Sequence, residues 1–225
     1  MSARDIVFAS IRASLGVNGQ EAPRKKIVAD RLAGHPVGVV PERGHLPPKE
    51  QVALFAKLLI AAAGTCDLVA SRDDVPGAIG NYLRQNNLPL AIRRGDDARL
   101  AELPWSREPM IDMSTGASDG QQLVSVSHAM AGVAETGTLV LVSGMDNPTT
   151  LNFLPDNHIV VLDAADLAGD LETVFVRLRE KFGEGVLPRV VNMITGPSRS
   201  ADIEQTLILG AHGPRRLHVI VVDGP

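Results

Sequence analysis

Apolar side chains recur at helical spacing at the start of the chain and in short, strand-like runs further along. From Ala3 to Leu15 they return every three or four positions, and Gly16 follows directly, so we predict an amphipathic helix that ends at Gly16. Residues 17–47 are rich in Gly, Pro and charge. We interpret them as an extended arm or linker, so that residues 1–47 form an N-terminal helix and arm.

From residue 48 onwards, predicted helices alternate with short predicted strands. The helices span residues 48–63, 75–86 and 165–182. The strands span residues 67–70, 88–92, 123–126, 139–143, 158–162, 190–194 and 217–222. The last two are nearly continuous apolar runs, which is typical of strands covered on both faces. We therefore predict an α/β domain over residues 48–225, with a mostly parallel sheet flanked by helices.

Composition and charge narrow the class of protein. The chain has 225 residues, of which 44% are hydrophobic, and this is enough for one domain with a short extension. A net charge of -4 does not match the basic surface of a nucleic-acid binder. The longest apolar stretch, residues 52–63, contains Lys57 and is too short to span a bilayer. Because the N-terminus also lacks the apolar block of a signal peptide, we expect a cytoplasmic protein without a membrane span.

The cysteine and histidine content argues against a redox or metal cofactor. Cys66 is the only cysteine, so this chain alone can form neither an internal disulfide nor a cysteine-ligated iron–sulfur cluster. The six histidines show no spacing typical of metal ligands, so we expect no metal site. A Gly-x-Ser-x-Gly elbow is also missing from the sequence, which argues against a serine hydrolase.

The first segment with candidate chemistry is the loop around Glu135, between two predicted strands. Its small neighbours include Thr136, Gly137 and Thr138, and small residues let a ligand approach the backbone closely. A carboxylate in such a loop can act as a general base, a nucleophile or a hydrogen-bond acceptor. The alternative is a surface turn with an ordinary solvated glutamate.

The second candidate segment is the loop after the predicted strand 190–194. Here Gly196 and a short predicted helix start would leave backbone N–H groups free at the carboxyl end of the sheet, an arrangement that binds anions. Ser198 and Ser200 could add hydroxyl donors, and Arg199 could bind a carboxylate or phosphate through two hydrogen bonds. The loop has neither the Walker ending nor the dinucleotide-binding glycine pattern.

Two further features bear on this second loop. His212 lies in a tight turn soon after it and could project into the same cleft. The alternative interpretation is a capped turn, in which Asp202 or Glu204 pairs with Arg199 and no ligand is involved. The residues alone do not separate these two interpretations.

Four segments in order identify a family resemblance. They are Ala134–Leu139, Leu154–Ile159, Ile194–Glu204 and Gly210–Pro214, which read AETGTL, LPDNHI, ITGPSRSADIE and GAHGP. Over roughly residues 50–222, their order and spacing resemble the LUD-domain family and, within it, the lactate-utilisation protein C family. The resemblance implies an α/β fold like that of CoA transferases, ribose-phosphate isomerase and glucosamine-phosphate deaminase.

The same resemblance implies a role in oxidising lactate to pyruvate together with two iron–sulfur partner proteins. Class I CoA transferases, which are more distant, use a glutamate nucleophile in a Ser-Glu-Asn-Gly loop, and Glu135 would occupy a similar place. Three hypotheses follow from these observations. The chain is an accessory subunit that binds a small anionic ligand between Glu135 and the Ser198–Arg199 loop. Alternatively, it is a stand-alone sugar-phosphate isomerase or acyl-CoA transferase that uses Glu135, or an assembly module in which both loops are structural.

Overall fold

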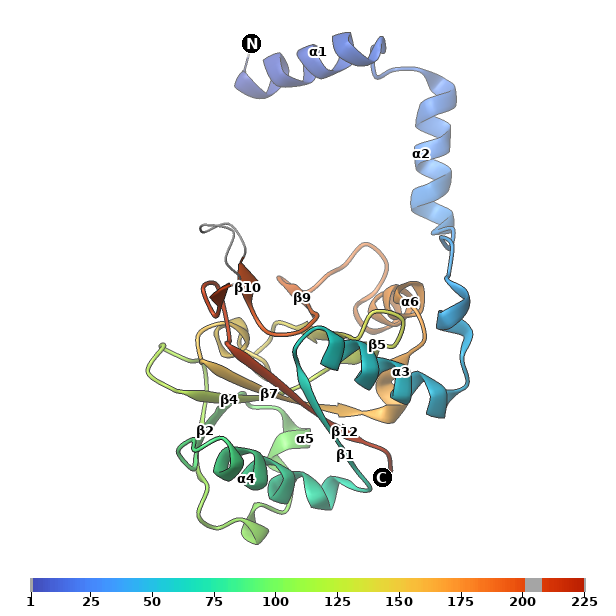
Figure 1. Ribbon diagram of the computed structural model, residues 1–225. Helices are drawn as coiled ribbons and strands as arrows, with labels where there is room; N and C mark the ends of the chain where they lie inside the picture. Colours follow the sequence, from blue (N-terminus) through green and yellow to red (C-terminus); the bar gives the residue numbers. More distant parts are fainter. Residues whose placement is uncertain (1, 201–207, 225) are drawn as a thin grey trace. The chain divides into compact units, whose positions relative to one another are not determined.

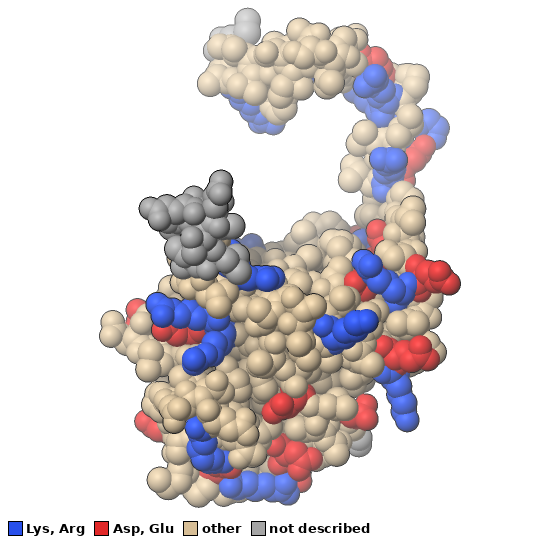
Figure 2. Space-filling model, in the orientation of Figure 1, with Lys and Arg blue, Asp and Glu red and all other residues tan. Residues whose placement is uncertain are grey.

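The computed structural model describes residues 2–200 and 208–224 (Figure 1). Contacts between Cα atoms divide the chain into two compact units, Met1–Val39 and Val40–Pro225. Within the described part of the chain, no helix is long and apolar enough to cross a membrane. On the face of the larger unit seen in Figure 2, basic and acidic side chains are interspersed.

The first unit contains two helices rather than one. Helix α1 spans Ala3–Leu15, and Gly16 ends it in the left-handed conformation, which confirms the prediction for this segment. Helix α2 spans Ala22–Gly34, so the prediction of an extended arm over residues 17–47 is wrong there. A proline in its first turn suits a helix start, Gly34 is its last residue, and the other Gly and Pro residues of residues 17–47 lie outside it.

The larger unit is built on a six-stranded sheet in which all neighbouring strands are parallel. In spatial order, its strands are β1 (Thr65–Val69), β12 (Arg216–Val222), β7 (Asn157–Asp163), β4 (Val124–His128), β2 (Ala91–Arg94) and β3 (Asp112–Thr115). Strands β7 and β12 are buried on both faces along most of their length. The prediction of a mostly parallel sheet is therefore confirmed.

A second, four-stranded sheet is antiparallel at most of its pairings. Its strands, in spatial order, are β8 (Leu167–Ala168), β5 (Ala131–Val133), β6 (Thr138–Val142) and β9 (Val191–Ile194). The sequence predicts β9 as a strand covered on both faces, and this is wrong. Among the described strands, β9 pairs with β6 alone, at the edge of the small sheet, and Met193 is 42% exposed.

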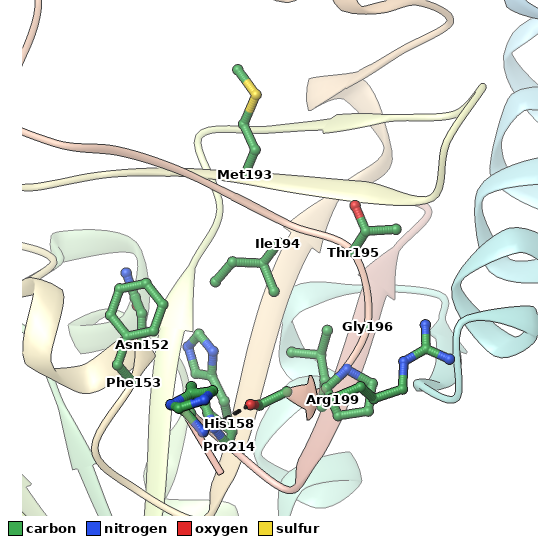
Figure 3. A pocket seen from close by; sticks show the side chains of 14 residues that line it. Asn152, Phe153, His158, Met193, Ile194, Thr195, Gly196, Arg199 and Pro214 are labelled. Carbon is green, nitrogen blue, oxygen red and sulfur yellow. Dashed lines mark hydrogen bonds between the residues drawn. The ribbon is translucent and has the colours of Figure 1, made fainter. Parts of the chain in front are cut away.

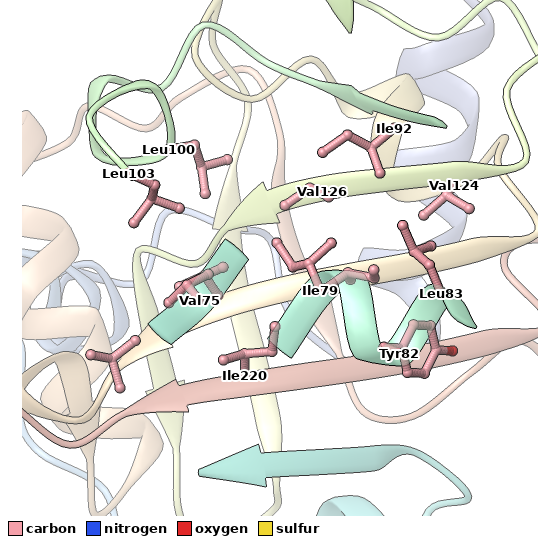
Figure 4. Packing of buried hydrophobic residues seen from close by; sticks show 13 residues of the cluster. Val75, Ile79, Tyr82, Leu83, Ile92, Leu100, Leu103, Val124, Val126 and Ile220 are labelled. Atoms are coloured by element: carbon pink, nitrogen blue, oxygen red, sulfur yellow. The ribbon is translucent and has the colours of Figure 1, made fainter. Parts of the chain in front are cut away.

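Helices cover both faces of the parallel sheet. On one face, α4 (Val75–Gln85) and α5 (Ala98–Ala101) pack on the sheet through a cluster of buried aliphatic side chains and Tyr82 (Figure 4). On the other face lie α3 (Pro48–Ala61), which contributes Phe55 and Leu59, and the small sheet. The outer side of the small sheet packs against α6 (Leu171–Phe182). Short 3-10 helices occur at Glu42–His45, Arg72–Asp74, Trp105–Arg107, Thr149–Asn152 and Ala164–Asp166.

Helix α6 begins six residues later than its sequence pattern predicts. The carboxylate of Asp170 accepts a hydrogen bond from the backbone N–H of Thr173 at 2.8 Å, which caps the helix at this point. The preceding residues form a 3-10 turn and strand β8. The apolar spacing before Asp170 therefore reflects burial in another element and not an earlier helical turn.

Candidate functional site

A pocket of about 270 Å³ lies beside the amino ends of β7 and β12 (Figure 3). Among the predicted ligand residues, Gly196, Ser198, Arg199 and His212 line it. The sequence places this loop at the carboxyl end of the parallel sheet, and that prediction is wrong. The loop does follow the carboxyl end of β9, but β9 belongs to the small sheet. The loop therefore lies at the edge of the parallel sheet where β7 and β12 begin.

Hydrogen bonds join the second loop to the turn that contains His212. The backbone N–H of Ser198 donates to the carbonyl oxygen of Pro214 at 2.9 Å, and its hydroxyl accepts from the backbone N–H of His212 at 3.2 Å. The sequence predicts free backbone N–H groups in this loop, but the N–H of Ser198 is already used within the protein. Ser198 holds the two segments together and so shapes the wall of the pocket.

The remaining predicted residues of this loop differ in their surroundings. Arg199 is exposed and begins the short strand β10 (Arg199–Ser200), which pairs with β11 (Ile208–Leu209), so the predicted helix start is wrong at these two positions. Ser200 is buried and is not part of the pocket lining. Asp202 and Glu204, the proposed partners of Arg199 in a capped turn, lie outside the described residues.

Glu135 occupies the turn between β5 and β6 but does not line this pocket. Its side chain is buried, with 8% of the residue exposed, and its Oε1 accepts a hydrogen bond from the backbone N–H of Leu171 at 3.0 Å. Leu171 is the first residue of α6, where a negative charge is favoured by the helix dipole. A solvated surface glutamate is therefore excluded, and the carboxylate supports the start of a helix.

The two predicted loops nevertheless meet in the folded chain. The hydroxyl groups of Thr138 and Thr195 are 2.6 Å apart, and Thr136 extends this chain of hydroxyls at 2.7 Å from Thr138. Thr195 lines the pocket, whereas Thr136 and Thr138 do not. The Glu135 loop thus contacts the loop that lines the pocket through Thr138 and Thr195, but it does not line the pocket itself.

The glycines of both loops allow a close approach of helix α3. A Cβ atom at Gly137 would lie 2.7 Å from the backbone nitrogen of Leu59, and one at Gly196 would lie 2.4 Å from the carbonyl oxygen of Ala62. Both glycines have positive φ, +67° and +83° respectively. The sequence pattern predicts that these glycines let a ligand approach the backbone. In the structure they let α3 and Ala62, the residue after it, pack closely instead.

Replacing Glu135 separates a structural role from a catalytic one. We expect Glu135→Ala to cost roughly 2 kcal/mol, because it leaves a helix N–H without its acceptor. Glu135→Gln keeps an oxygen at the same place, and we expect it to cost less than about 1 kcal/mol. Urea denaturation measures both values, with the exposed Glu184→Ala as control. A Glu135→Gln protein that folds normally but has lost function would contradict the structural role.

The polar floor of the pocket was not predicted from the sequence. Asn152 and His158 line the pocket, and each is 1% exposed. Between them lies Ser127, whose hydroxyl donates to Asn152 Oδ1 at 3.3 Å and is 3.0 Å from His158 Nε2. Burial lowers the pKa of His158 from 6.5 to about 3, so the imidazole is neutral at physiological pH. In β4, Ser125 and Ser127 alternate with apolar residues, and buried serines in such a strand are the feature of the sequence that indicates a polar group in the core.

A second group of titratable side chains lies at the carboxyl ends of β4 and β7, where those strands end in His128 and Asp163. His128 Nε2 is 3.2 Å from Asp163 Oδ2, which also binds the guanidinium of Arg72. Burial raises the pKa of Asp163, but His128 and Arg72 outweigh this effect and hold the pKa below its ordinary value. The charge of the Asp163 carboxylate is therefore balanced by the Arg72 guanidinium. Among the described residues, no three His, Cys, Asp or Glu side chains are grouped so that they could hold a metal ion.

The larger unit is therefore an α/β domain whose pocket is formed by segments far apart in the sequence. Residues 52–222 match the LUD domain family, and the chain belongs to that family. The match covers both candidate loops and all the residues of the polar floor. The finer likeness to CoA transferases stays a prediction.

Individual relatives match shorter parts of the chain. An uncharacterised protein of Neisseria meningitidis is 34% identical over 150 residues, which is 64% of each chain. Lactate utilization protein C of Shouchella clausii is 36% identical over 100 residues, and that of Halalkalibacterium halodurans is 38% identical over 101 residues. Each of these two matches covers 44% of both chains. The chain thus aligns with less than two thirds of the length of each relative.

A solved structure shares the fold. The crystal structure of a DUF162 family protein from Deinococcus radiodurans superimposes with a TM-score of 0.55 at 23% sequence identity. The superposition covers 79% of this chain and 99% of the other. At this level of identity, the likeness concerns the fold alone.

Proposed function

We propose that this chain takes part in lactate utilisation and binds a small anionic ligand in the pocket beside the second loop. The first part rests on the similarity to proteins named lactate utilization protein C. The second part rests mainly on the pocket itself, which combines the cationic side chain of Arg199 with a buried polar floor. A guanidinium group binds a carboxylate through two parallel hydrogen bonds, so a small carboxylate suits this pocket.

The size of the pocket favours a small ligand. Its volume of about 270 Å³ is below the roughly 300–1,000 Å³ that is usual for sites that hold drug-sized molecules. Ile194, Pro214 and Leu217 supply apolar surface, which suits a short hydrocarbon group. A short-chain carboxylate thus matches the pocket in volume, charge and polarity.

We further propose that the chain acts in the cytoplasm with iron–sulfur partner proteins, which would carry the electrons when lactate is oxidised to pyruvate. The single cysteine, Cys66, supports this division of labour, because a cysteine-ligated cluster needs several thiolates. Burial also raises the pKa of Cys66 to about 11, which disfavours the thiolate form. This chain would therefore contribute ligand binding, and the partners would contribute the redox centres.

A stand-alone isomerase or CoA transferase that uses Glu135 has less support. The Glu135 carboxylate is bonded to the start of α6 and lies outside the lining of the pocket. A nucleophile or general base must instead be within reach of the reacting atoms of its substrate. The observed position agrees better with a supporting role for Glu135.

Growth on lactate tests the proposal. We expect deletion of the gene to abolish growth on lactate as sole carbon source, and the intact gene to restore it. Arg199→Ala should restore growth poorly, because the pocket then lacks the guanidinium. Arg215→Ala is the matched control: it removes an exposed, nearby arginine that does not line the pocket. Normal growth of the deletion strain would refute the role in lactate utilisation.

Pull-down of the tagged chain from lactate-grown cells tests the proposed partners. We expect proteins with iron–sulfur absorption to copurify with it. Recovery of the chain without such proteins, under conditions where growth requires it, would contradict the partner proposal. It would leave the proposal of an anion-binding pocket intact.

A further inference from the structure

We infer that Asn152, Ser127 and His158 form a hydroxyl-binding floor, and that the pocket prefers a short hydroxycarboxylate to the corresponding oxo acid. The inference rests on the proposed function, since it concerns the same pocket, and it adds the group that the floor recognises. Two buried polar atoms carry the argument. Asn152 Nδ2 and His158 Nδ1 have no hydrogen-bond partner among the described residues, although both side chains line the pocket.

The internal hydrogen bonds fix what these two atoms offer to a ligand. The hydroxyl proton of Ser127 is donated to Asn152 Oδ1, so the Ser127 oxygen can only accept from His158. His158 Nε2 must then carry the ring hydrogen, which leaves a lone pair on Nδ1. The floor therefore presents one acceptor, His158 Nδ1, and one donor, Asn152 Nδ2.

A ligand hydroxyl has a hydrogen to donate and an oxygen that accepts, which are the two groups that these atoms lack. Its hydrogen is donated to His158 Nδ1, and its oxygen accepts from Asn152 Nδ2. A ketone oxygen can accept from Asn152 but has no hydrogen for His158, and a methylene group satisfies neither. Because a buried polar atom without a partner costs free energy, either replacement should weaken binding about tenfold, which is about 1.4 kcal/mol.

Hydrogen bonds to the parallel sheet hold the residues of the floor in place. The hydroxyl of Ser125, two residues before Ser127 on β4, donates to the carbonyl oxygen of Leu151 at 2.6 Å. This bond fixes the 3-10 turn that carries Asn152 against the sheet. His158 lies on β7, directly beside Ser125 in the strand register. Figure 3 shows Asn152 and Phe153 on one side of the pocket and Arg199 on the other, so the hydroxyl and carboxylate ends of a ligand would face different walls.

Calorimetric titration of the purified full-length chain tests this inference with four probes: sodium L-lactate, D-lactate, pyruvate and propionate. We expect at least one lactate enantiomer to bind about tenfold more tightly than pyruvate and propionate. Asn152→Leu should remove that preference and leave propionate binding little changed. Ser127→Ala, which removes the link between the two atoms without removing either of them, should reduce the preference.

His158→Leu and His218→Leu form a matched pair, because both histidines are buried and each has one ring nitrogen without a hydrogen-bond partner among the described residues. They lie on different strands, and His218 is not part of this pocket. Only His158→Leu should change the preference for lactate, and thermal melting shows whether each variant folds. Equal affinity of the wild-type chain for lactate, pyruvate and propionate would refute the hydroxyl-binding floor. It would not contradict the proposal that the pocket binds a small anion. If none of the four probes binds, both proposals about the pocket fail.

Discussion

Replacing Gly196 with alanine should destabilise the folded chain by about 3 kcal/mol. Two costs add at this position. An alanine in the left-handed conformation costs about 1–2 kcal/mol, and Gly196 has a φ of +83°. The new methyl group would also lie 2.4 Å from the carbonyl oxygen of Ala62, so the pocket loop or the residue that follows α3 would have to move.

Gly77→Ala provides the control for this substitution. Gly77 lies within α4, and a Cβ atom there would meet nothing within 4 Å. We expect it to stabilise the chain by about 0.5–1 kcal/mol, because alanine restricts the unfolded chain and favours the helix. Urea denaturation of both variants gives the comparison. An unchanged free energy of unfolding for Gly196→Ala would mean that the loop is not packed against α3 as described.

Acid should destabilise the chain strongly between pH 6.5 and pH 4, because two buried histidines resist protonation. Burial lowers the pKa of His158 to about 3 and that of His218 to about 4, from an ordinary value of 6.5. For His218, the nearby Asp67 opposes the effect of burial in part. Both rings are therefore neutral in the folded chain under conditions in which the unfolded chain is already protonated.

The direction of the effect follows from proton linkage. Below pH 6.5 the unfolded state binds more protons than the folded state, so falling pH favours unfolding. The full contribution of these histidines to stability is present above pH 6.5. It is lost progressively as the pH falls towards about 4 for His218 and about 3 for His158. At about 1.4 kcal/mol per pKa unit, each histidine accounts for roughly 3 kcal/mol by pH 4.

Urea denaturation at several pH values measures this loss. Together the two histidines account for a large part of the roughly 5–15 kcal/mol by which domains are usually stable, so we expect the chain to unfold readily near pH 4. His158→Leu and His218→Leu should each reduce the slope of stability against pH over this range. If the slope is the same in the wild-type chain and both variants, the two imidazoles are not buried in the neutral form.

The candidate site was only partly predictable from the sequence. The second loop was found because a Gly- and Ser-rich segment with an arginine directly follows an apolar strand. Its position beside the amino ends of β7 and β12 was missed, since apolar spacing reports that a strand is buried but not which sheet it joins. Asn152 and His158 were missed because their importance depends on Ser127, which lies 25 residues before one and 31 before the other.

Glu135 is a residue for which the sequence predicts a ligand contact that the structure does not show. A lone carboxylate among small residues predicted a ligand contact, but its hydrogen-bond partner is the backbone of Leu171, 36 residues further along. Nothing in the local sequence specifies this pairing, because any backbone N–H can donate to a carboxylate. The small neighbours of Glu135 were also ambiguous, since a glycine admits a packed helix as readily as it admits a ligand.

The sequence by itself determined the elements and the family: helix α1 with its end at Gly16, helices α3 and α4, the buried strands β7 and β12, and the four ordered segments of the LUD domain. Periodicity and turn residues act over a few positions, so they can be read from the chain directly. Only the tertiary structure decided which strands form which sheet, that α3 packs against both glycine loops, and that a polar floor and Arg199 line the same pocket. These features depend on contacts between residues far apart in the chain, and local pattern does not encode them.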